Sequence, residues 1–310
     1  MFATKLLATR SPTTAAKSFR HGAKVVLTTP RRVHMQPFST AGPPLPPPAA
    51  VASSTRESLS PREGLPRWPS LTSATGCLRT LDWFGSVVFA VSGSLTAATA
   101  GCDLLGCTLI GTITAVGGGT LRDALVLNKQ PFWIEEWEYL VFSGAAAAGA
   151  FYLWGQIPAG DEVIEGTGLT LKSTDGGEGT LMDWGDAVGV GAFAVIGAMN
   201  GIRAQSPLLV SALCGMMTST FGGMTRDTLL NRPVRILHPY ADTYAPIAFT
   251  GAAAYLAMRA VAPQYQGLRI ASCVALAVGL RQQAWTDGWR LPHWDVEGVV
   301  AHSAHDPRTQ

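Results

Sequence analysis

The sequence is poor in charged residues for its length. Only 14% of its 310 residues are charged and 47% are hydrophobic, and the mean hydropathy is +0.20. About a quarter of the residues of an average soluble domain are charged. The composition therefore excludes an ordinary soluble domain and is typical of a membrane protein.

Cysteine and histidine, which build many metal and catalytic sites, are scarce as well. The five cysteines form no C-x-x-C pair, and their odd number gives no disulfide framework. The six histidines all lie outside the long apolar stretches. The sequence therefore predicts no metal site, no cofactor and no catalytic residue, and it argues against an intramembrane enzyme.

Acidic residues are absent from the first 56 residues, which instead contain eight lysines and arginines and many serines and threonines. Subtracting those eight charges from the formal net charge of +2 leaves −6 for the rest of the chain. The basic charge therefore belongs to the leader, and no nucleic-acid partner is implied. A basic, acid-free leader is typical of a transit peptide, and a disordered basic tail is the alternative. We expect an address to the mitochondrial inner membrane or, alternatively, to a plastid or another organelle membrane.

Long apolar stretches are what the sequence has in abundance. A transmembrane helix needs about 20 mostly apolar residues, because all its backbone polar groups must be hydrogen-bonded internally. Seven stretches meet this description: 83–101, 104–128, 138–156, 184–203, 208–230, 244–262 and 267–285. The sequence thus predicts an all-α protein with seven transmembrane helices in a lipid bilayer.

Two parts of the chain repeat each other at an offset of 104 residues. The repeated motifs are Asp82-x-x-Gly85-x-x-x-Phe89, which recurs as Asp186-x-x-Gly189-x-x-x-Phe193, and Gly118-Gly119-x-x-Arg122-Asp123, which recurs as Gly222-Gly223-x-x-Arg226-Asp227. Each copy holds three spans, an odd number, so the second copy must enter the membrane from the opposite face. Such an inverted 3+3 repeat is common in transport proteins, and duplication without transport is the alternative.

The repeat divides the chain into segments. We expect residues 1–56 to be the transit peptide with a disordered Pro-rich linker, 57–77 a further linker and 78–156 the first three-helix repeat. We expect 157–182 to be a flexible acidic loop and 183–262 the second repeat. The seventh helix with the end of the fold then occupies 263–292, and 293–310 form a tail.

Glycine clusters followed by Arg-Asp pairs mark the predicted passage. Glycines weaken an apolar helix and allow its backbone to kink, and freed backbone groups are tolerated only where protein or water receives them. Ionisable residues in a span usually mark a substrate path, with interfacial anchoring as the alternative. Since adjacent residues do not face each other on a helix, each arginine should bind an acid or carbonyl elsewhere. The predicted path residues are Gly117, Gly118, Gly119, Arg122, Asp123, Gly222, Gly223, Arg226 and Asp227.

Hydroxyl side chains in the first span are candidates for lining the same path. Ser92, Ser94, Thr96 and Thr99 can replace part of the hydration of an ion or a zwitterion. Two aspartates, Asp82 and Asp186, stand at the beginning of the first and fourth spans, and we expect them to cap those helices. A second role at a cation entrance is the alternative for both aspartates.

The repeated motifs resemble the bacterial membrane family named for a glycine transporter domain, which is related to the trimeric intracellular cation channels. The resemblance covers about residues 78–292. It rests on Asp82-x-x-Gly85 with Phe89-Ala90-Val91-Ser92-Gly93, on Gly117-Gly118-Gly119-Thr120-Leu121-Arg122-Asp123, on Gly222-Gly223-Met224-Thr225-Arg226-Asp227 and on Trp289-Arg290-Leu291-Pro292.

The resemblance implies seven helices arranged as 3+3+1, a homotrimer, and a hydrophilic pore in each protomer along the second and fifth helices. Two functions fit both the resemblance and the repeat. One is a passive pore for monovalent cations such as potassium. The other is a carrier of glycine or a similar small zwitterion, and a purely structural membrane subunit also stays open. The Lys-Glu-Val signature of the animal channels is absent, which argues against lipid-regulated gating.

Overall fold

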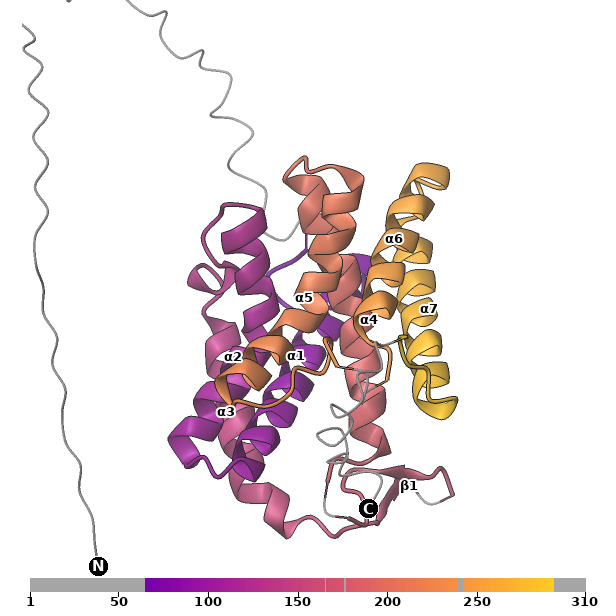
Figure 1. Cartoon of the computed structure of the whole chain (residues 1–310). Helices are drawn as coiled ribbons and strands as arrows, with labels where there is room; N and C mark the ends of the chain where they lie inside the picture. The colour runs from indigo at the N-terminus through magenta and orange to yellow at the C-terminus, as the bar shows by residue number, and fades with distance from the viewer. Residues whose placement is uncertain (1–64, 165, 176, 239–241, 293–310) are drawn as a thin grey trace, which may run out of the picture. The chain divides into compact units, whose positions relative to one another are not determined.

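The computed structural model describes residues 65–164, 166–175, 177–238 and 242–292, so the predicted transit peptide and tail lie outside the described residues. Within this part, seven α-helices pack into a bundle (Figure 1). The α-helices are α1 (Ala74–Thr99), α2 (Leu104–Leu121), α3 (Glu138–Leu153), α4 (Thr180–Arg203), α5 (Leu208–Leu229), α6 (Ala245–Val261) and α7 (Gln266–Thr286). The shorter elements are η1 (Arg122–Val126), η2 (Phe132–Ile134), η3 (Trp154–Gln156), β1 (Glu162–Ile164) and β2 (Leu169–Thr170).

The seven predicted stretches correspond to these seven helices, and the predicted fold class is confirmed. Four helices are long and apolar enough to cross a membrane by length and composition: α1, α2 with its continuation η1, α4 and α5. Helix α6 is apolar but shorter. The first two helices of each repeat therefore carry the strongest membrane signal, and α3, α6 and α7 pack beside them.

The starts of α1 and α4 correct the sequence prediction. Helix α1 is capped by Ser73, whose Oγ accepts a hydrogen bond from the backbone N–H of Gly76 at 3.1 Å. Asp82 consequently lies inside α1 and Asp186 inside α4, and neither caps its helix. The prediction was wrong because the helices begin before the apolar stretches do: α1 starts at Ala74 and its stretch at 83, and α4 starts at Thr180 and its stretch at 184.

The two repeats meet along an approximate twofold axis. A Cβ built on Gly85 would lie 2.8 Å from the Cα of Gly189, and one built on Gly189 would lie 3.1 Å from the Cα of Gly85. Beside them the rings of Phe89 and Phe193 contact edge to face, with centroids 5.2 Å apart. A Cβ built on Gly185, four residues before Gly189, would lie 3.0 Å from Val88, three residues after Gly85. Helices α1 and α4 therefore cross in opposite directions, as an inverted repeat requires.

Helices α2 and α5 cross at the predicted glycine clusters. A Cβ on Gly118 would clash with the carbonyl oxygen of Thr218, and a Cβ on Gly222 would clash with that of Thr114. The two contacts are exchanged by the offset of 104 residues, so α2 and α5 are also antiparallel. Their ends therefore point to opposite sides of the bundle.

These glycines do not break their helices, which corrects the expected kinks. Helix α2 continues through Gly117, Gly118 and Gly119, and α5 continues through Gly222 and Gly223. The missing side chains instead let the two backbones approach closely, which is the usual role of small residues between membrane helices. Departure from α-helical geometry begins only after the first cluster, in the π-helical segment η1.

The connection between the repeats is not a plain loop. Strands β1 and β2 form an antiparallel hairpin, and an isolated bridge joins Lys172 to Glu178. The backbone N–H of Gly179 donates to the carbonyl of Leu171 at 3.0 Å, and Thr180 Oγ1 donates to the carbonyl of Gly168 at 2.9 Å. The hairpin is thus attached directly to the first turn of α4.

Candidate functional site

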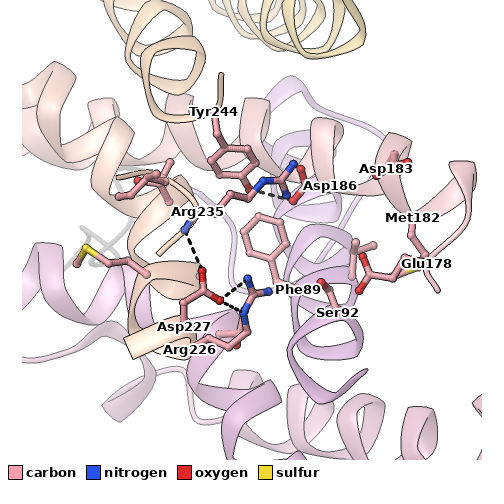
Figure 2. Close-up of a pocket in the computed structure, with 16 residues that line it drawn as sticks. Phe89, Ser92, Glu178, Met182, Asp183, Asp186, Arg226, Asp227, Arg235 and Tyr244 are labelled. Carbon is pink, nitrogen blue, oxygen red and sulfur yellow. Dashed lines mark hydrogen bonds and ion pairs between the residues drawn. The ribbon is translucent and has the colours of Figure 1, made fainter. Parts of the chain in front are cut away.

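A cavity lies between α1, α4 and α5, near the start of α4, the middle of α1 and the end of α5. Figure 2 shows charged and aromatic side chains pointing into it. We call it the deep cavity. Its walls are formed by Val88, Phe89, Ser92, Thr114, Glu178, Met182, Asp183, Asp186, Thr220, Gly223, Met224, Arg226, Asp227, Arg235, Ile236 and Tyr244.

A second, outer cavity adjoins the deep one. It extends past Thr96 and Thr99 of α1 to the hairpin and to Arg232. The residues that line both cavities are Ser92, Glu178, Asp183, Arg226 and Arg235, and we call this set the junction. The two cavities adjoin at these residues and together extend from Thr99, at the end of α1, to Val88 near its middle, and we refer to the pair as the passage.

Asp186 faces the deep cavity and is held by two other helices. The hydroxyl of Tyr244, at the start of α6, donates to its Oδ1 at 2.9 Å, and Nη2 of Arg281, on α7, lies 3.4 Å from its Oδ2. The guanidinium of Arg281 also stacks over the ring of Tyr244, with its carbon 4.7 Å from the centroid. Helices α6 and α7 therefore fix the position of a cavity carboxylate on α4.

Asp82, the equivalent residue of the first copy, is sealed from solvent. Arg79 Nη1 lies 3.3 Å from Asp82 Oδ2, which also accepts a short hydrogen bond from the hydroxyl of Tyr139. Arg79 is fully buried and binds both carboxylate oxygens of Glu136, at 2.6 and 3.0 Å. The two copies thus share an aspartate held by a tyrosine and an arginine, but only the second copy exposes it to a cavity described here.

The Arg-Asp pairs have a geometry that the sequence prediction missed. Arg226 Nη2 lies 2.7 Å from the carboxylate of the adjacent Asp227, and Arg122 Nη2 lies 2.6 Å from that of the adjacent Asp123. The expectation that adjacent residues do not pair was wrong, because the long guanidinium side chain folds back along the helix. Arg122 also reaches the other repeat, where its Nη1 donates to Thr218 Oγ1 at 3.1 Å.

Each aspartate of these pairs also fixes the chain that follows its helix. Asp123 Oδ2 accepts from the backbone N–H of Phe132 at 3.1 Å, and Asp227 Oδ2 accepts from that of Arg235 at 3.2 Å. The bond from Asp227 holds the backbone N–H of Arg235 at the wall of the deep cavity. The pair therefore combines a charged lining residue with a structural support.

The structure brings only part of the predicted path together. Ser92, Gly223, Arg226 and Asp227 line the deep cavity, and Thr96 and Thr99 line the outer one. The remaining path residues, Gly117, Gly118, Gly119, Gly222, Arg122 and Asp123, are buried in helix contacts and line neither cavity. Ser94 also lies elsewhere, since its hydroxyl donates to the carbonyl of Ala147 on α3 at 2.8 Å.

Sequence reasoning missed several lining residues, and Glu178 is the most notable. It belongs to the connection between the repeats, where the many acidic residues of 157–182 were the only available signal. Burial raises the pKa of the Glu178 carboxyl, while a hydrogen bond from the Ser92 hydroxyl and the charge of Arg226 act in the opposite direction. Ser92 and Glu178 lie beside each other on one wall of the cavity (Figure 2).

Comparison with known proteins relates both repeats to one family. The family model described as "Glycine transporter" matches residues 79–155 and 183–260, which together make half of the chain. The chain belongs to the glycine transporter family. In this family, a UPF0126 membrane protein of Deinococcus radiodurans is 31% identical over 179 residues, covering 57% of this chain and 74% of the relative. The inner membrane protein YadS of Escherichia coli is 29% identical over 175 residues, covering 55% and 73%.

Solved structures similar to this family member are cation channels. A TRIC cation channel is 26% identical with a TM-score of 0.60, covering 71% of this chain and 98% of that one. The trimeric intracellular cation channel orthologue of Rhodobacter sphaeroides is 32% identical with a TM-score of 0.56, covering 68% and 98%. The chain is therefore a multi-pass membrane protein with the fold of these channels.

Proposed function

We propose that the chain forms a passive pore for monovalent cations, with potassium as the permeant ion. The observation that carries this proposal is the polar passage inside a single protomer, which enters the bundle between α1, α4 and α5. Carboxylates of Glu178, Asp183 and Asp186 line its deep part. Acidic groups in a confined passage favour cations, and the similar solved structures are cation channels.

The lining positions support a path for the ion. Hydroxyls of Ser92 and Thr96 can replace part of its hydration shell, and Gly223 leaves room beside Arg226 and Asp227. The crossing glycines Gly117, Gly118, Gly119 and Gly222 hold α2 against α5 at the inner end of this path. By the symmetry of the repeat, we assign Arg122 and Asp123 to the opposite half of the same path.

A carrier of glycine is the competing function, and one observation favours it. The deep cavity contains both carboxylates and the guanidinium groups of Arg226 and Arg235, which could bind the two charged ends of a small zwitterion. Flux into liposomes that contain the purified protein separates the two functions. A potassium flux that glycine does not alter supports the pore, whereas saturable glycine counterflow without potassium current refutes it.

We further propose that the functional unit is a homotrimer in the bilayer, as the name of the Rhodobacter sphaeroides orthologue indicates for that protein. The mass of the complex in detergent, measured by light scattering with the detergent contribution subtracted, tests this assembly. A monomer that conducts potassium would refute the trimer and leave the pore intact.

The organelle address rests on the charge of the leader alone. The basic residues of 1–56 lie outside the described part of the chain and outside the family match, and the relatives found are bacterial. We retain a mitochondrial inner membrane location as a proposal. Import of the full chain into isolated mitochondria, followed by protease protection, tests it, and the same chain lacking residues 1–56 is the control.

A further inference from the structure

Glu178 occupies an unusual place in the passage. It precedes α4 and belongs to the connection between the repeats, yet it lines both the deep and the outer cavity. An ion that moves from the outer cavity to Asp186 therefore passes Glu178. The other side of the junction is formed by Arg226 of α5 and Arg235 of the segment that follows α5.

The hairpin fixes the position of Glu178. An antiparallel backbone bridge pairs Glu178 with Lys172, which follows β2. The N–H of the next residue, Gly179, donates to the carbonyl of Leu171. The ammonium of Lys172 in turn donates to the carbonyls of Trp154 and Ile157 at 3.3 and 3.4 Å. The end of α3, the hairpin and the start of α4 thus hold this carboxylate at the junction.

The arginines at the junction are engaged by other groups. Arg226 forms an ion pair with Asp227, and the guanidinium of Arg235 stacks over the ring of Tyr244, 5.0 Å from its centroid, near the charge of Asp186. Glu178, by contrast, is hydrogen-bonded by the neutral hydroxyl of Ser92. Since these contacts pair neither arginine with Glu178, its carboxylate can interact with an ion in the passage.

We propose that Glu178 is the residue at the junction that makes the passage select cations over anions. This inference rests on the proposed pore function and extends it to a residue of the connection between the repeats. A carboxylate about 4 Å from a cation favours it about fivefold even in water-like surroundings, and disfavours an anion to the same degree. The connection between the repeats thus contributes to the pore, since it carries Glu178, which the hairpin holds in place.

Other charged groups face the same space and set the background selectivity. They are Asp183 and Asp186 on α4, Arg226, Asp227 and Arg235 on the α5 side, and Asp175 and Arg232 at the outer opening, together with the neutral phenol of Tyr244. Burial raises the pKa of Glu178, so mild acid should protonate this carboxyl and remove its charge.

The test is the reversal potential of purified full-length protein in planar bilayers under a KCl gradient. We expect the Glu178→Gln variant to conduct with a potassium-over-chloride permeability ratio reduced about 25-fold, since the effects on the cation and on the anion multiply. The Asp161→Asn variant, which alters an exposed acid of the same connection that lines neither cavity, should keep the ratio of the unaltered protein. A second measurement needs no variant, because the ratio of the unaltered protein should fall on acidification from about pH 8 to about pH 5.

Each outcome has a distinct meaning. An unchanged ratio in Glu178→Gln, or an unaltered protein whose ratio is insensitive to acid, overturns the role of Glu178 and leaves the pore standing. An equal loss of selectivity in Asp161→Asn also overturns it, since a general effect of surface charge would then suffice. Absence of any potassium current from the unaltered protein overturns the proposed function together with this inference.

Discussion

The crossing of α2 and α5 yields the sharpest prediction about stability, because its glycines contact backbone atoms. In the Gly222→Ala variant the new Cβ would clash with the carbonyl oxygen of Thr114. A carbonyl in a helix cannot rotate away as a side chain can, so the helices must separate. Inserting one methyl group into a packed core typically costs about 1–3 kcal/mol, and we expect the upper end of this range.

The assay is thermal unfolding of the purified variants in detergent, and Gly149→Ala is the matched control. Gly149 also lies inside a helix, α3, but a Cβ there would have nothing within 4 Å. Alanine should therefore leave stability unchanged or raise it by about 0.5–1 kcal/mol through its better helix propensity. The reasoning would be refuted if Gly222→Ala unfolded at the same temperature as the unaltered protein.

The symmetry of the repeat sharpens this prediction further. Gly118→Ala should destabilise like Gly222→Ala, because its Cβ would clash with the carbonyl oxygen of Thr218 in the equivalent contact. One separation of the helices relieves both clashes, so the double variant should lose less stability than the two single losses added together. Strict additivity would show that the two contacts do not belong to one helix crossing.

Three further predictions concern buried charges and hydrogen bonds. Arg79→Ala should destabilise by about 3–5 kcal/mol in chemical unfolding, because it leaves the buried carboxylate of Glu136 without its guanidinium; a loss below about 1 kcal/mol would contradict the ion pair. Thr218→Val, which removes the hydroxyl bound by Arg122, should cost about 1–3 kcal/mol by the same assay, and Thr218→Ser should restore most of it. Potassium current should rise with pH through the raised pKa of Glu178, since the carboxyl becomes charged only above it, and Glu178→Gln should flatten this rise.

The sequence was sufficient to predict the helices and their arrangement. Apolar stretches located all seven helices, and the offset of 104 residues identified equivalent pairs such as Gly85 with Gly189, which the structure places against each other. Both features can be read from the sequence alone, because they depend on local composition and on the repetition of motifs. The start of α1 was not predicted well: the apolar stretch begins at 83, and the nine helical residues before it, which include Arg79 and Asp82, carry too many polar side chains to be assigned to the span.

The site was less predictable, because it depends on where side chains point. Spacing indicated Arg226 and Asp227 but not that they bind each other, since the path of a guanidinium along a helix is decided by its surroundings. Glu178 reaches the cavity only because the hairpin docks on α4, a tertiary contact that no local pattern encodes. Asp186 was identified as an entrance candidate, but its partner Arg281 comes from the seventh helix, far away in the chain.

The unequal environments of Asp82 and Asp186 have an electrical consequence. In the proposed pore, water and ions in the passage beside Asp186 would conduct, so little of the membrane voltage would fall across that half of the protein. The voltage is concentrated instead over the sealed half, which contains Arg79, Asp82 and the buried guanidinium of Arg122. A unit charge that crosses the full potential changes energy by about 2.3 kcal/mol per 100 mV. A charge displaced a short way in the sealed half would therefore sense a large share of that energy, whereas the same displacement beside Asp186 would sense little.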